Sequence, residues 1–253
     1  MNWRRQLALA RIKRFDRDAL VWLLAGEHNP GSLDWCRVRW WRWLMQSMSA
    51  SDIFTLIYAK NIWGSAESRS GAGSTLDETL SLRHNLPALL RQYQITSLLD
   101  IPCGDFHWMS AIDLGGVAYT GADIVAELVA AAEQQYGQPG RKFIHLDLLA
   151  DALSPADAIL CRDCLVHLPN LDVMKAIANI RASGATYLLA TTFPARQIND
   201  EISLGYWRPI NLERAPFNLP PPIAILHEGN PDSAFSDKSL GMWRVAEIPV
   251  DGS

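Results

Sequence analysis

The clearest pattern in the chain is an alternation of short apolar runs and longer helical stretches that begins at Ile95. Apolar segments typical of buried strands are predicted at 97–101, 117–124, 143–146, 158–161 and 186–191. Helices are predicted at 125–136 and 171–182, with a further helix starting from Phe106. Strands that alternate with helices in this way predict a parallel sheet with helices on both faces.

Beyond Pro194 the chain is rich in proline, and only shorter strands are predicted, at 224–227 and 243–248. Late, short strands of this kind can complete a parallel sheet as an antiparallel edge. The predicted fold class is therefore α/β: a Rossmann-like, mostly parallel sheet with helices on both faces and an antiparallel C-terminal edge, preceded by an N-terminal helical extension.

The first part of the chain differs in composition from the rest. Residues 1–48 hold nine Arg or Lys against four acidic residues, and six of the ten tryptophans. Two helical pieces are expected there, separated by the Pro-Gly-Ser sequence at 30–32, and another helix at 51–63. The alternation of Arg and Trp at 37–44 has two interpretations. It is either a surface for an acidic membrane or a phosphorylated partner protein, or a cap whose tryptophans pack on the main domain.

A loop of small residues at 64–74 follows, and then a helix predicted at 76–93. Ser74 or Thr75 is expected to cap this helix, and Pro87 to break or kink it. The chain is accordingly divided into a helical N-terminal extension, residues 1–63, and a main domain, residues 64–253.

Composition narrows the function classes. The chain has 253 residues, 49% of them hydrophobic and 20% charged, which is typical of a soluble globular protein. Its formal net charge of −4 disfavours nucleic acid as a partner. The four cysteines show no disulfide framework, and no apolar run approaches the roughly 20 residues of a membrane span. We therefore expect a cytoplasmic protein with reduced thiols.

Chemistry-bearing residues follow the first three predicted strands. Asp100 ends the first strand, and a tight turn containing Gly104 leads from it towards a helix. Glycine lets a ligand approach the backbone at such a strand end. Asp123 closes the second strand 23 residues after Asp100, the spacing at which an acid accepts hydrogen bonds from ribose hydroxyls in dinucleotide-binding folds. Asp147 follows the third strand and could meet an adenine edge.

Together with the segment 161–167 (Cys-Arg-Asp-Cys-Leu-Val-His), these features resemble the successive motifs of class I S-adenosylmethionine-dependent methyltransferases over about residues 95–193. The resemblance implies that Asp100 faces the methionine end of the cofactor and that Gly104 passes close under it. It also implies that Asp123 holds the ribose diol and Asp147 lies near adenine, while residues 162–167 border the acceptor pocket. Pro102, Cys103 and Ile124 complete the expected cofactor-binding residues of these turns.

The turn departs from the usual glycine-rich pattern, because Pro102 and Phe106 occupy its first and third glycine positions. A dinucleotide pyrophosphate needs close backbone approach over several glycines, whereas S-adenosylmethionine has no phosphate. The departure therefore favours S-adenosylmethionine. Two alternatives stay open: a nucleotide-dependent oxidoreductase, and a non-catalytic binding module with a methyltransferase-like fold.

The loop at 64–74 also has two interpretations. It could fold over the cofactor, with backbone donors and Arg69 meeting the methionine carboxylate, or it could be a linker between extension and core. Trp63, just before it, could cover the cofactor, but packing is the favoured interpretation.

Asp163 and His167 are the candidate catalytic residues. Four positions apart, they share a face if the chain turns helical after the fourth strand, and a His beside an Asp suits a general base. The alternative is a histidine that only closes the loop by hydrogen bonding. Cys161 and Cys164 form a Cys-x-x-Cys pair without further metal ligands at a suitable spacing, so packing is favoured and no metal is expected.

The methyl acceptor is the least defined part of the prediction. An O or N atom of a small molecule is favoured over a protein side chain. No Asn-Pro-Pro-Tyr-like tetrapeptide follows the fourth strand, which disfavours methylation of amino groups of bases or of glutamine. Tyr206, Trp207, Arg208 and Asn211 are either substrate contacts or residues that order a proline-rich loop.

Overall fold

A computed structural model describes residues 48–229 and 235–249. Its central feature is a seven-stranded sheet with the order β3-β2-β1-β4-β5-β7-β6. The strands are β1 (Ser97–Asp100), β2 (Ala118–Asp123), β3 (Arg141–His145), β4 (Ala158–Cys161), β5 (Tyr187–Thr192), β6 (Ala224–His227) and β7 (Ser239–Arg244). The first five pair in parallel, and β7 runs antiparallel to both β5 and β6. The Rossmann-like fold class with its antiparallel C-terminal strand is confirmed.

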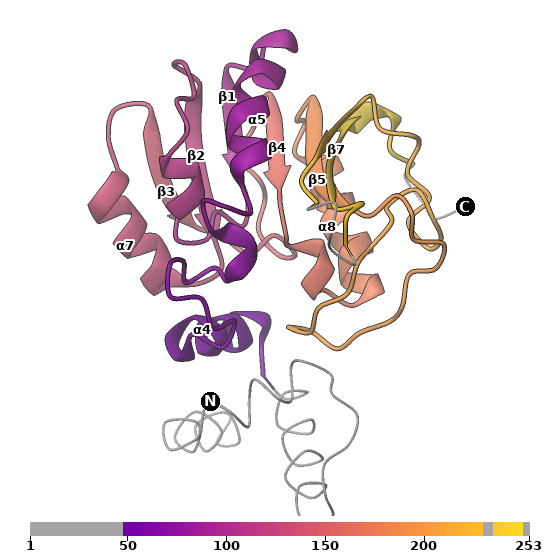
Figure 1. Ribbon diagram of the computed structural model, residues 1–253, viewed down its shortest axis with the longest axis horizontal. Coiled ribbons are helices and arrows are strands. Elements are labelled where there is room, and N and C mark those ends of the chain that lie inside the picture. Colours follow the sequence, from indigo (N-terminus) through magenta and orange to yellow (C-terminus); the bar gives the residue numbers. More distant parts are fainter. Residues whose placement is uncertain (1–47, 230–234, 250–253) are drawn as a thin grey trace, which may run out of the picture.

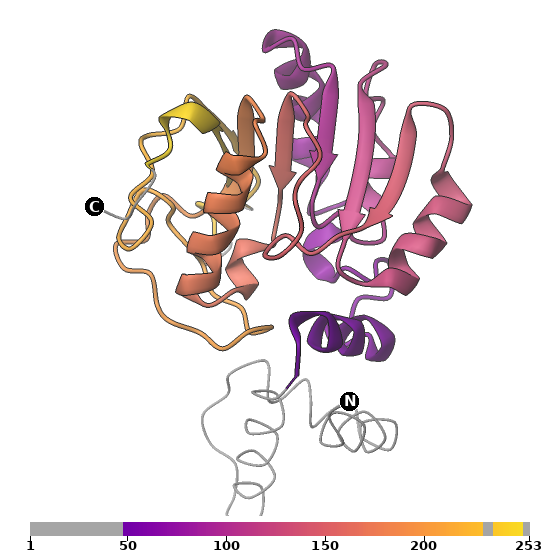
Figure 2. The same cartoon turned by 180° about the vertical axis from the view of Figure 1, so that it is seen from behind.

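Helices cover both faces of this sheet. They are α4 (Ala50–Lys60), α5 (Leu80–Gln92), α6 (His107–Ser110), α7 (Ala126–Tyr136) and α8 (Asn170–Ala182), with 3-10 turns at Ala72–Ser74, Leu165–His167 and Val245–Glu247. In Figure 1 α5 lies in front of the sheet, and in Figure 2, seen from behind, α8 lies in front. None of the helices described by the structure is long and apolar enough to cross a membrane.

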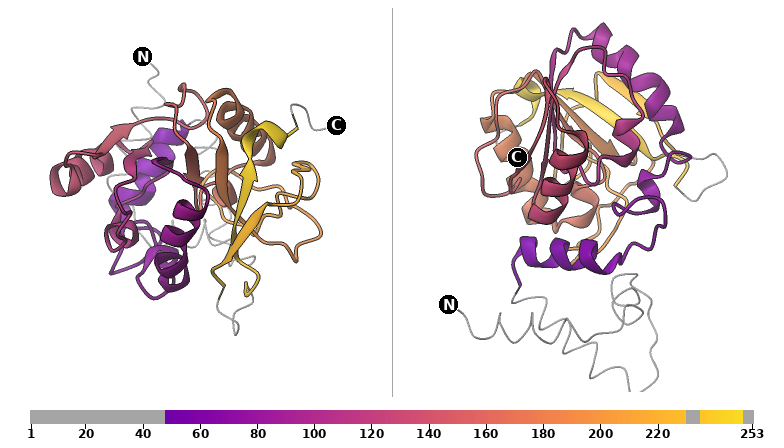
Figure 3. Two further views of the ribbon diagram at one scale, coloured as in Figure 1. Left: turned by 90° about the horizontal axis from the view of Figure 1, so that it is seen from above. Right: turned by 90° about the vertical axis from the view of Figure 1, so that its left-hand side faces the viewer.

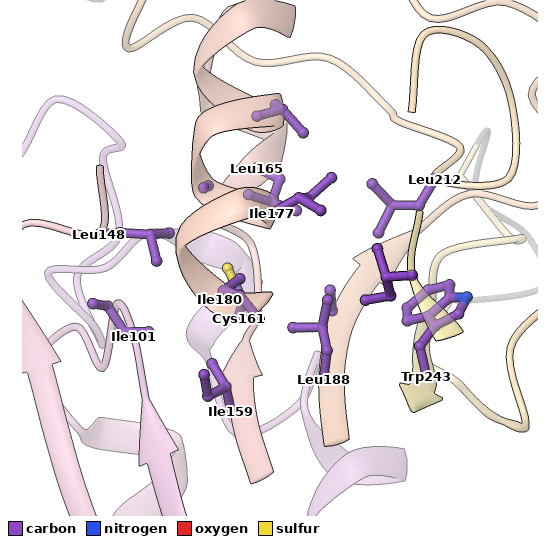
Figure 4. Packing of buried hydrophobic residues seen from close by; sticks show 14 of the residues in the cluster. Ile101, Leu148, Ile159, Cys161, Leu165, Ile177, Ile180, Leu188, Leu212 and Trp243 are labelled. Atoms are coloured by element: carbon purple, nitrogen blue, oxygen red, sulfur yellow. The ribbon is translucent and has the colours of Figure 1, made fainter. Parts of the chain in front are cut away.

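Two hydrophobic clusters, one on each face, hold the layers together. One joins α8 to β4 and β5, and Figure 4 shows Ile177 and Ile180 of α8 packed against them, with Trp243 of β7 beside β5. The other joins α5 and α6 to the opposite face. All four residues of β4 are buried, as expected for a central strand covered on both sides.

Helix α4 lies across the end of the sheet at which the parallel strands finish (Figure 3, right). Ser49 caps it, and the hydroxyl of Ser51 donates to the carbonyl of Ile124 just after β2 (3.4 Å). This helix belongs to the predicted extension 1–63, whose division from the main domain stays a prediction. The Trp/Arg segment and the helical pieces expected before residue 48 lie outside the described residues.

The predicted start of the helix at 76–93 is wrong, and so is a break of this helix at Pro87. Helix α5 begins only at Leu80, with Thr79 as its N-cap, and runs unbroken through Pro87. Four buried leucines anchor this helix to the sheet, and their packing outweighs the missing N–H of the proline (Leu82, Leu86, Leu89 and Leu90).

The last strand is predicted at 243–248, but β7 spans Ser239–Arg244 and residues 245–247 form a 3-10 turn. The indole of Trp243 packs over Gly241 so closely that a Cβ there would lie 2.4 Å from the ring. A glycine required by packing therefore lies in the strand, and an apolar run is a poor guide to it.

The two leucines Leu160 and Leu171 test this account of the core. Leu160, in β4, is fully buried, whereas Leu171, at the start of α8, is 76% exposed. We expect Leu160→Ala to lower the free energy of unfolding by about 2–5 kcal/mol because it leaves a cavity, and Leu171→Ala to change it by less than about 0.5 kcal/mol. Urea denaturation measures both, and equal losses would contradict the assignment of β4 to the core.

Candidate functional site

One cavity of about 550 Å³ lies where β1, β2 and β4 end, beneath α4 and the loop 64–74. The residues predicted from the sequence as catalytic or cofactor-binding all line it: Arg69, Asp100, Pro102, Cys103, Gly104, Asp123, Ile124, Asp147, Asp163 and His167. The carboxyl ends of parallel strands are where such folds bind ligands. The structure therefore brings these residues together, while their individual roles stay predictions.

Asp123 and Gly104 form the connection between the first two strand ends. The backbone N–H of Gly104 donates to Oδ2 of Asp123 (3.2 Å), and that of Val125 donates to Oδ1 (3.0 Å). Burial raises the pKa of Asp123 to about 6, and the backbone donors oppose that rise. A carboxylate offers about four lone-pair sites, so these backbone donors leave capacity for a ligand.

Asp100 is the more strongly buried charge. Burial raises the pKa of its carboxyl to about 7, although the hydroxyl of Tyr119 donates to Oδ2 at 2.5 Å and Arg162 also lowers the value. The surroundings of Asp100 therefore disfavour its charged form, and a further cation or hydrogen-bond donor beside it would stabilise that form.

Phe106, at the third glycine position, does not enter the cavity. Its backbone is left-handed (φ 58°), and its ring is fully buried against Tyr119, Tyr136 and Phe143 in the core. Pro102, at the first glycine position, forms part of the cavity wall. The two substitutions therefore leave the space at the strand ends open.

The loop 64–74 is fastened to the turn after β1 by Asp105. Its carboxylate accepts hydrogen bonds from the hydroxyl of Ser68 (3.0 Å), the backbone N–H of Arg69 (2.7 Å) and the hydroxyl of Ser70 (3.2 Å). Residues 69–74 consequently line the cavity, so the loop is more than a linker. Sequence reasoning did not identify this contact, for which the serines of the loop were the available signal.

Arg69 and Asp147 lie at the cavity with differing freedom. The side chain of Arg69 is exposed, and its guanidinium donates to the carbonyl of Tyr58 (3.4 Å). Asp147 is half-buried, and its Oδ1 accepts the backbone N–H of Leu149 (2.8 Å). Ile124, Leu146 and Leu148 supply apolar surface to the same wall.

Asp163 does not share a helix face with His167, because it has left-handed backbone (φ 49°) and precedes the 3-10 turn Leu165–His167. Its Oδ2 pairs with the ammonium of Lys238 (2.7 Å) and the guanidinium of Arg162 (3.3 Å). Burial alone would raise the pKa of Asp163, but these two cations hold it well below its usual range. The side chain is thus a fixed anion at the cavity wall.

His167 has the protonation pattern that a base needs. Its Nδ1 lies 2.9 Å from the carbonyl oxygen of Tyr206, so Nδ1 carries the hydrogen and Nε2 the lone pair. Burial lowers the pKa of His167, which keeps the ring neutral near pH 7. The ring of Trp63 stacks on it at 4.9 Å, so Trp63 both packs and lines the cavity.

Sequence reasoning missed Glu228 and Lys238, which complete the charged wall. The guanidinium of Arg162 donates to Oε2 of Glu228 through Nε (2.9 Å) and Nη2 (2.7 Å), and Nη2 also lies 2.8 Å from the carbonyl of Gly73. Glu228 follows β6 and Lys238 precedes β7. Their ion pairs place both side chains beside Arg162 and Asp163, which follow β4.

The C-terminal loop contributes one of its four proposed contacts directly. Trp207 lines the cavity with Phe193 and Phe235. Arg208 and Asn211 do not line it: both are buried and donate to backbone carbonyls that order the loop. Tyr206 supplies the carbonyl that holds His167.

Comparisons with known proteins concern the fold. No protein-family model matches the chain, and no curated protein sequence matches it. Solved structures similar to it include the magnesium protoporphyrin IX methyltransferase of Synechocystis PCC 6803 with bound SAH (18% identity, 58% of this chain and 71% of that chain, TM-score 0.43). The methyltransferase domain of bacterial CtHen1-C is another (14%, 67% and 98%, TM-score 0.49), as is human N-acetylserotonin methyltransferase with SAM (16%, 58% and 43%, TM-score 0.40).

The sheet has five neighbouring parallel strands and an antiparallel edge, as the pattern of apolar segments in the sequence predicts. These features define a Rossmann-like α/β fold. Within this Rossmann-like fold, the cavity lies at the strand ends that carry Asp100 and Asp123.

Gly104 and Gly115 test the attachment of the loop. Both have positive φ (56° and 61°), but a Cβ on Gly104 would lie 2.2 Å from Oγ of Ser70, whereas one on Gly115 would meet nothing within 4 Å. We expect Gly104→Ala to push Ser70 from Asp105 and to speed tryptic cleavage after Arg69 by about tenfold, because backbone strain and a clash add. Gly115→Ala carries the same backbone strain without the clash and should leave that cleavage unchanged. Equal acceleration in both variants would contradict the attachment of the loop to Asp105 through Ser70.

Asp100 gives a pH-dependent prediction. Its folded-state pKa of about 7 lies above the unfolded value of about 3.9, so the native state loses stability as pH rises from 4 to 7. Asp100→Asn should therefore resemble the parent at pH 4.5 and exceed its unfolding free energy by about 1–4 kcal/mol at pH 8. Denaturation at both pH values measures this, with Asp77→Asn at an exposed position as the control. A variant less stable than its parent at pH 8 would show that Asp100 is not buried at a cost.

Proposed function

We propose that the chain binds S-adenosylmethionine and transfers its methyl group to an O or N atom of a small molecule. The observation that carries this proposal is the pair of buried carboxylates, Asp100 and Asp123, at adjacent strand ends on one cavity with Gly104 between them. Burying two acids is unfavourable, and a ligand that supplies further hydrogen bonds or positive charge would offset that cost.

The cavity suits the nucleoside half of this cofactor. Asp123 has free lone pairs for a ribose diol, and the apolar side chains of Ile124, Leu146 and Leu148 suit a flat base, with Asp147 at its edge. The turn holds a single glycine, and the third glycine position is taken by Phe106 in the core. That arrangement suits a ligand without a pyrophosphate better than a dinucleotide.

The other half of the cofactor carries an ammonium, a carboxylate and a sulfonium. Asp100 is the acid available to the ammonium, and Arg69 with the backbone of residues 70–74 is available to the carboxylate. Asp105 keeps that loop in place through its bonds to Ser68 and Ser70. The proposal thus gives the loop a binding role.

When bound, the cofactor supplies an electrophilic methyl group with a good leaving group. The protein's part is then to hold the acceptor in line with that methyl and to exclude water. His167 holds its proton on Nδ1 and offers Nε2 to take a proton from an acceptor hydroxyl or amine. Asp163 acts beside it as a fixed negative charge, rather than through a hydrogen bond to the ring.

The location of the protein and the nature of its partners are proposed from the sequence. A cytoplasmic location, a small-molecule acceptor and the absence of a nucleic-acid partner are proposed on composition and charge. The Trp/Arg segment 37–44 remains a candidate for membrane or protein contact.

Calorimetric titration of the full chain tests the proposal. S-adenosylmethionine and S-adenosylhomocysteine should bind, whereas NAD and NADP should not. Asp123→Asn should weaken binding about 10- to 150-fold, because hydrogen bonds to a charged group contribute about 1.5–3 kcal/mol. Asp77→Asn removes an exposed acid and should leave the affinity unchanged. NAD binding in place of S-adenosylmethionine would favour the oxidoreductase alternative, and no binding by the folded parent would favour the non-catalytic module.

A further inference from the structure

Four charged side chains form a closed cluster on the cavity wall beyond the strand-end acids. Arg162 and Lys238 face Asp163 and Glu228, and the ammonium of Lys238 lies 2.7 Å from Asp163 Oδ2 and 3.5 Å from Glu228 Oε2. Arg162 is buried and stacks over the ring of Trp108 (5.0 Å). Two cations and two anions balance, so the cluster carries no net charge.

One oxygen of this cluster is unpartnered. Oε2 of Glu228 receives both Arg162 bonds and faces Lys238, but Oε1 has no hydrogen-bond partner among the described residues. The side chain of Glu228 is 1% exposed, and the residue lines the cavity. A buried carboxylate oxygen without a donor is costly, and buried polar groups are normally satisfied. Oε1 is therefore a buried acceptor in a residue of the cavity wall that lacks a donor among the described residues.

The balance of the cluster restricts which donor fits. A cationic ligand would be repelled by Arg162 and Lys238, because the negative charge of the cluster is already neutralised. A carboxylate ligand would be repelled by Glu228. A neutral O–H or N–H satisfies Oε1 without adding charge. The surrounding wall is aromatic, with Trp63, Phe193, Trp207 and Phe235 among its residues. Such surfaces suit a flat, apolar ring.

We propose that Glu228 is the specificity residue of the pocket for the methyl acceptor. Its unpartnered Oε1 accepts a hydrogen bond from a neutral hydroxyl or N–H on a flat aromatic substrate. That the ligand is the methyl acceptor rests on the proposed function. That it carries a neutral hydrogen-bond donor on an aromatic ring rests on the structure alone. Sites built to bond a donor group discriminate strongly against analogues that lack it, because the buried protein group is then left unpaired.

Three naphthalene probes test the chemistry on the full chain saturated with S-adenosylhomocysteine. They are 2-naphthol, which has a neutral donor, 2-methoxynaphthalene, which has the same ring without the donor, and 2-naphthylmethylamine, which is cationic at pH 7. We expect 2-naphthol to bind at least about tenfold more tightly than the other two in calorimetric titration.

Glu228→Gln tests the residue. Its amide oxygen should turn to Arg162 and Lys238, which leaves the NH₂ group at the position of Oε1. Because 2-naphthol and 2-methoxynaphthalene can both accept from that group, the preference should fall to about one. Glu247→Gln, which removes an exposed carboxylate paired with Arg244, is the matched control and should keep the preference.

Every outcome decides the proposal. A parent preference below about threefold, a tighter cationic probe, or no binding by any probe would overturn it. A preference that survives Glu228→Gln would overturn the role of this residue. If that variant does not fold, the comparison of probes on the parent still decides. If S-adenosylhomocysteine does not bind, the proposed function fails separately, and the same probe ratio without it still tests Glu228.

Discussion

The burial of two carboxylates at the ends of β1 and β2 is the constraint on which the rest of the site depends. Asp123 is tolerated there because the backbone N–H groups of Gly104 and Val125 point at it. Asp100 has the hydroxyl of Tyr119 and the nearby charge of Arg162, and its pKa is nevertheless raised to about 7. Gly104 is placed by the same turn, and its missing side chain admits Ser70. The loop, the turn and the acids thus form one connected arrangement at the strand ends.

Much of this arrangement is accessible from the sequence, because it follows from local patterns and one rule of topology. The apolar runs predict the five parallel strands, and the carboxyl ends of parallel strands lie at one edge. Residues that directly follow strands, such as Asp123 and Asp147, can therefore be assigned to one cavity from their positions in the chain. Segment 158–161 is predicted with the bounds of β4 because its apolar residues are buried on both faces.

What the sequence does not reveal depends on contacts between distant segments. Glu228 reaches the site only because β7 pairs with β5 and β6 pairs with β7, and its partner Arg162 is 66 positions away in the chain. The bonds of Asp105 to Ser68 and Ser70 likewise join the loop to the turn after β1. In both cases the residues carry ordinary polar side chains, and only the fold makes them a cluster. The unbroken helix through Pro87 has the same origin, since tertiary packing outweighs a local preference.

We propose that the cavity receives the adenosine of S-adenosylmethionine at Asp123. A crystal structure of the full chain grown with S-adenosylhomocysteine would reveal the position of the ribose. We expect both ribose hydroxyls within about 3.2 Å of the Asp123 carboxylate oxygens, with the homocysteine end beside Asp100 and the loop 64–74. A ribose bound away from Asp123, or a ligand bound outside this cavity, would contradict it.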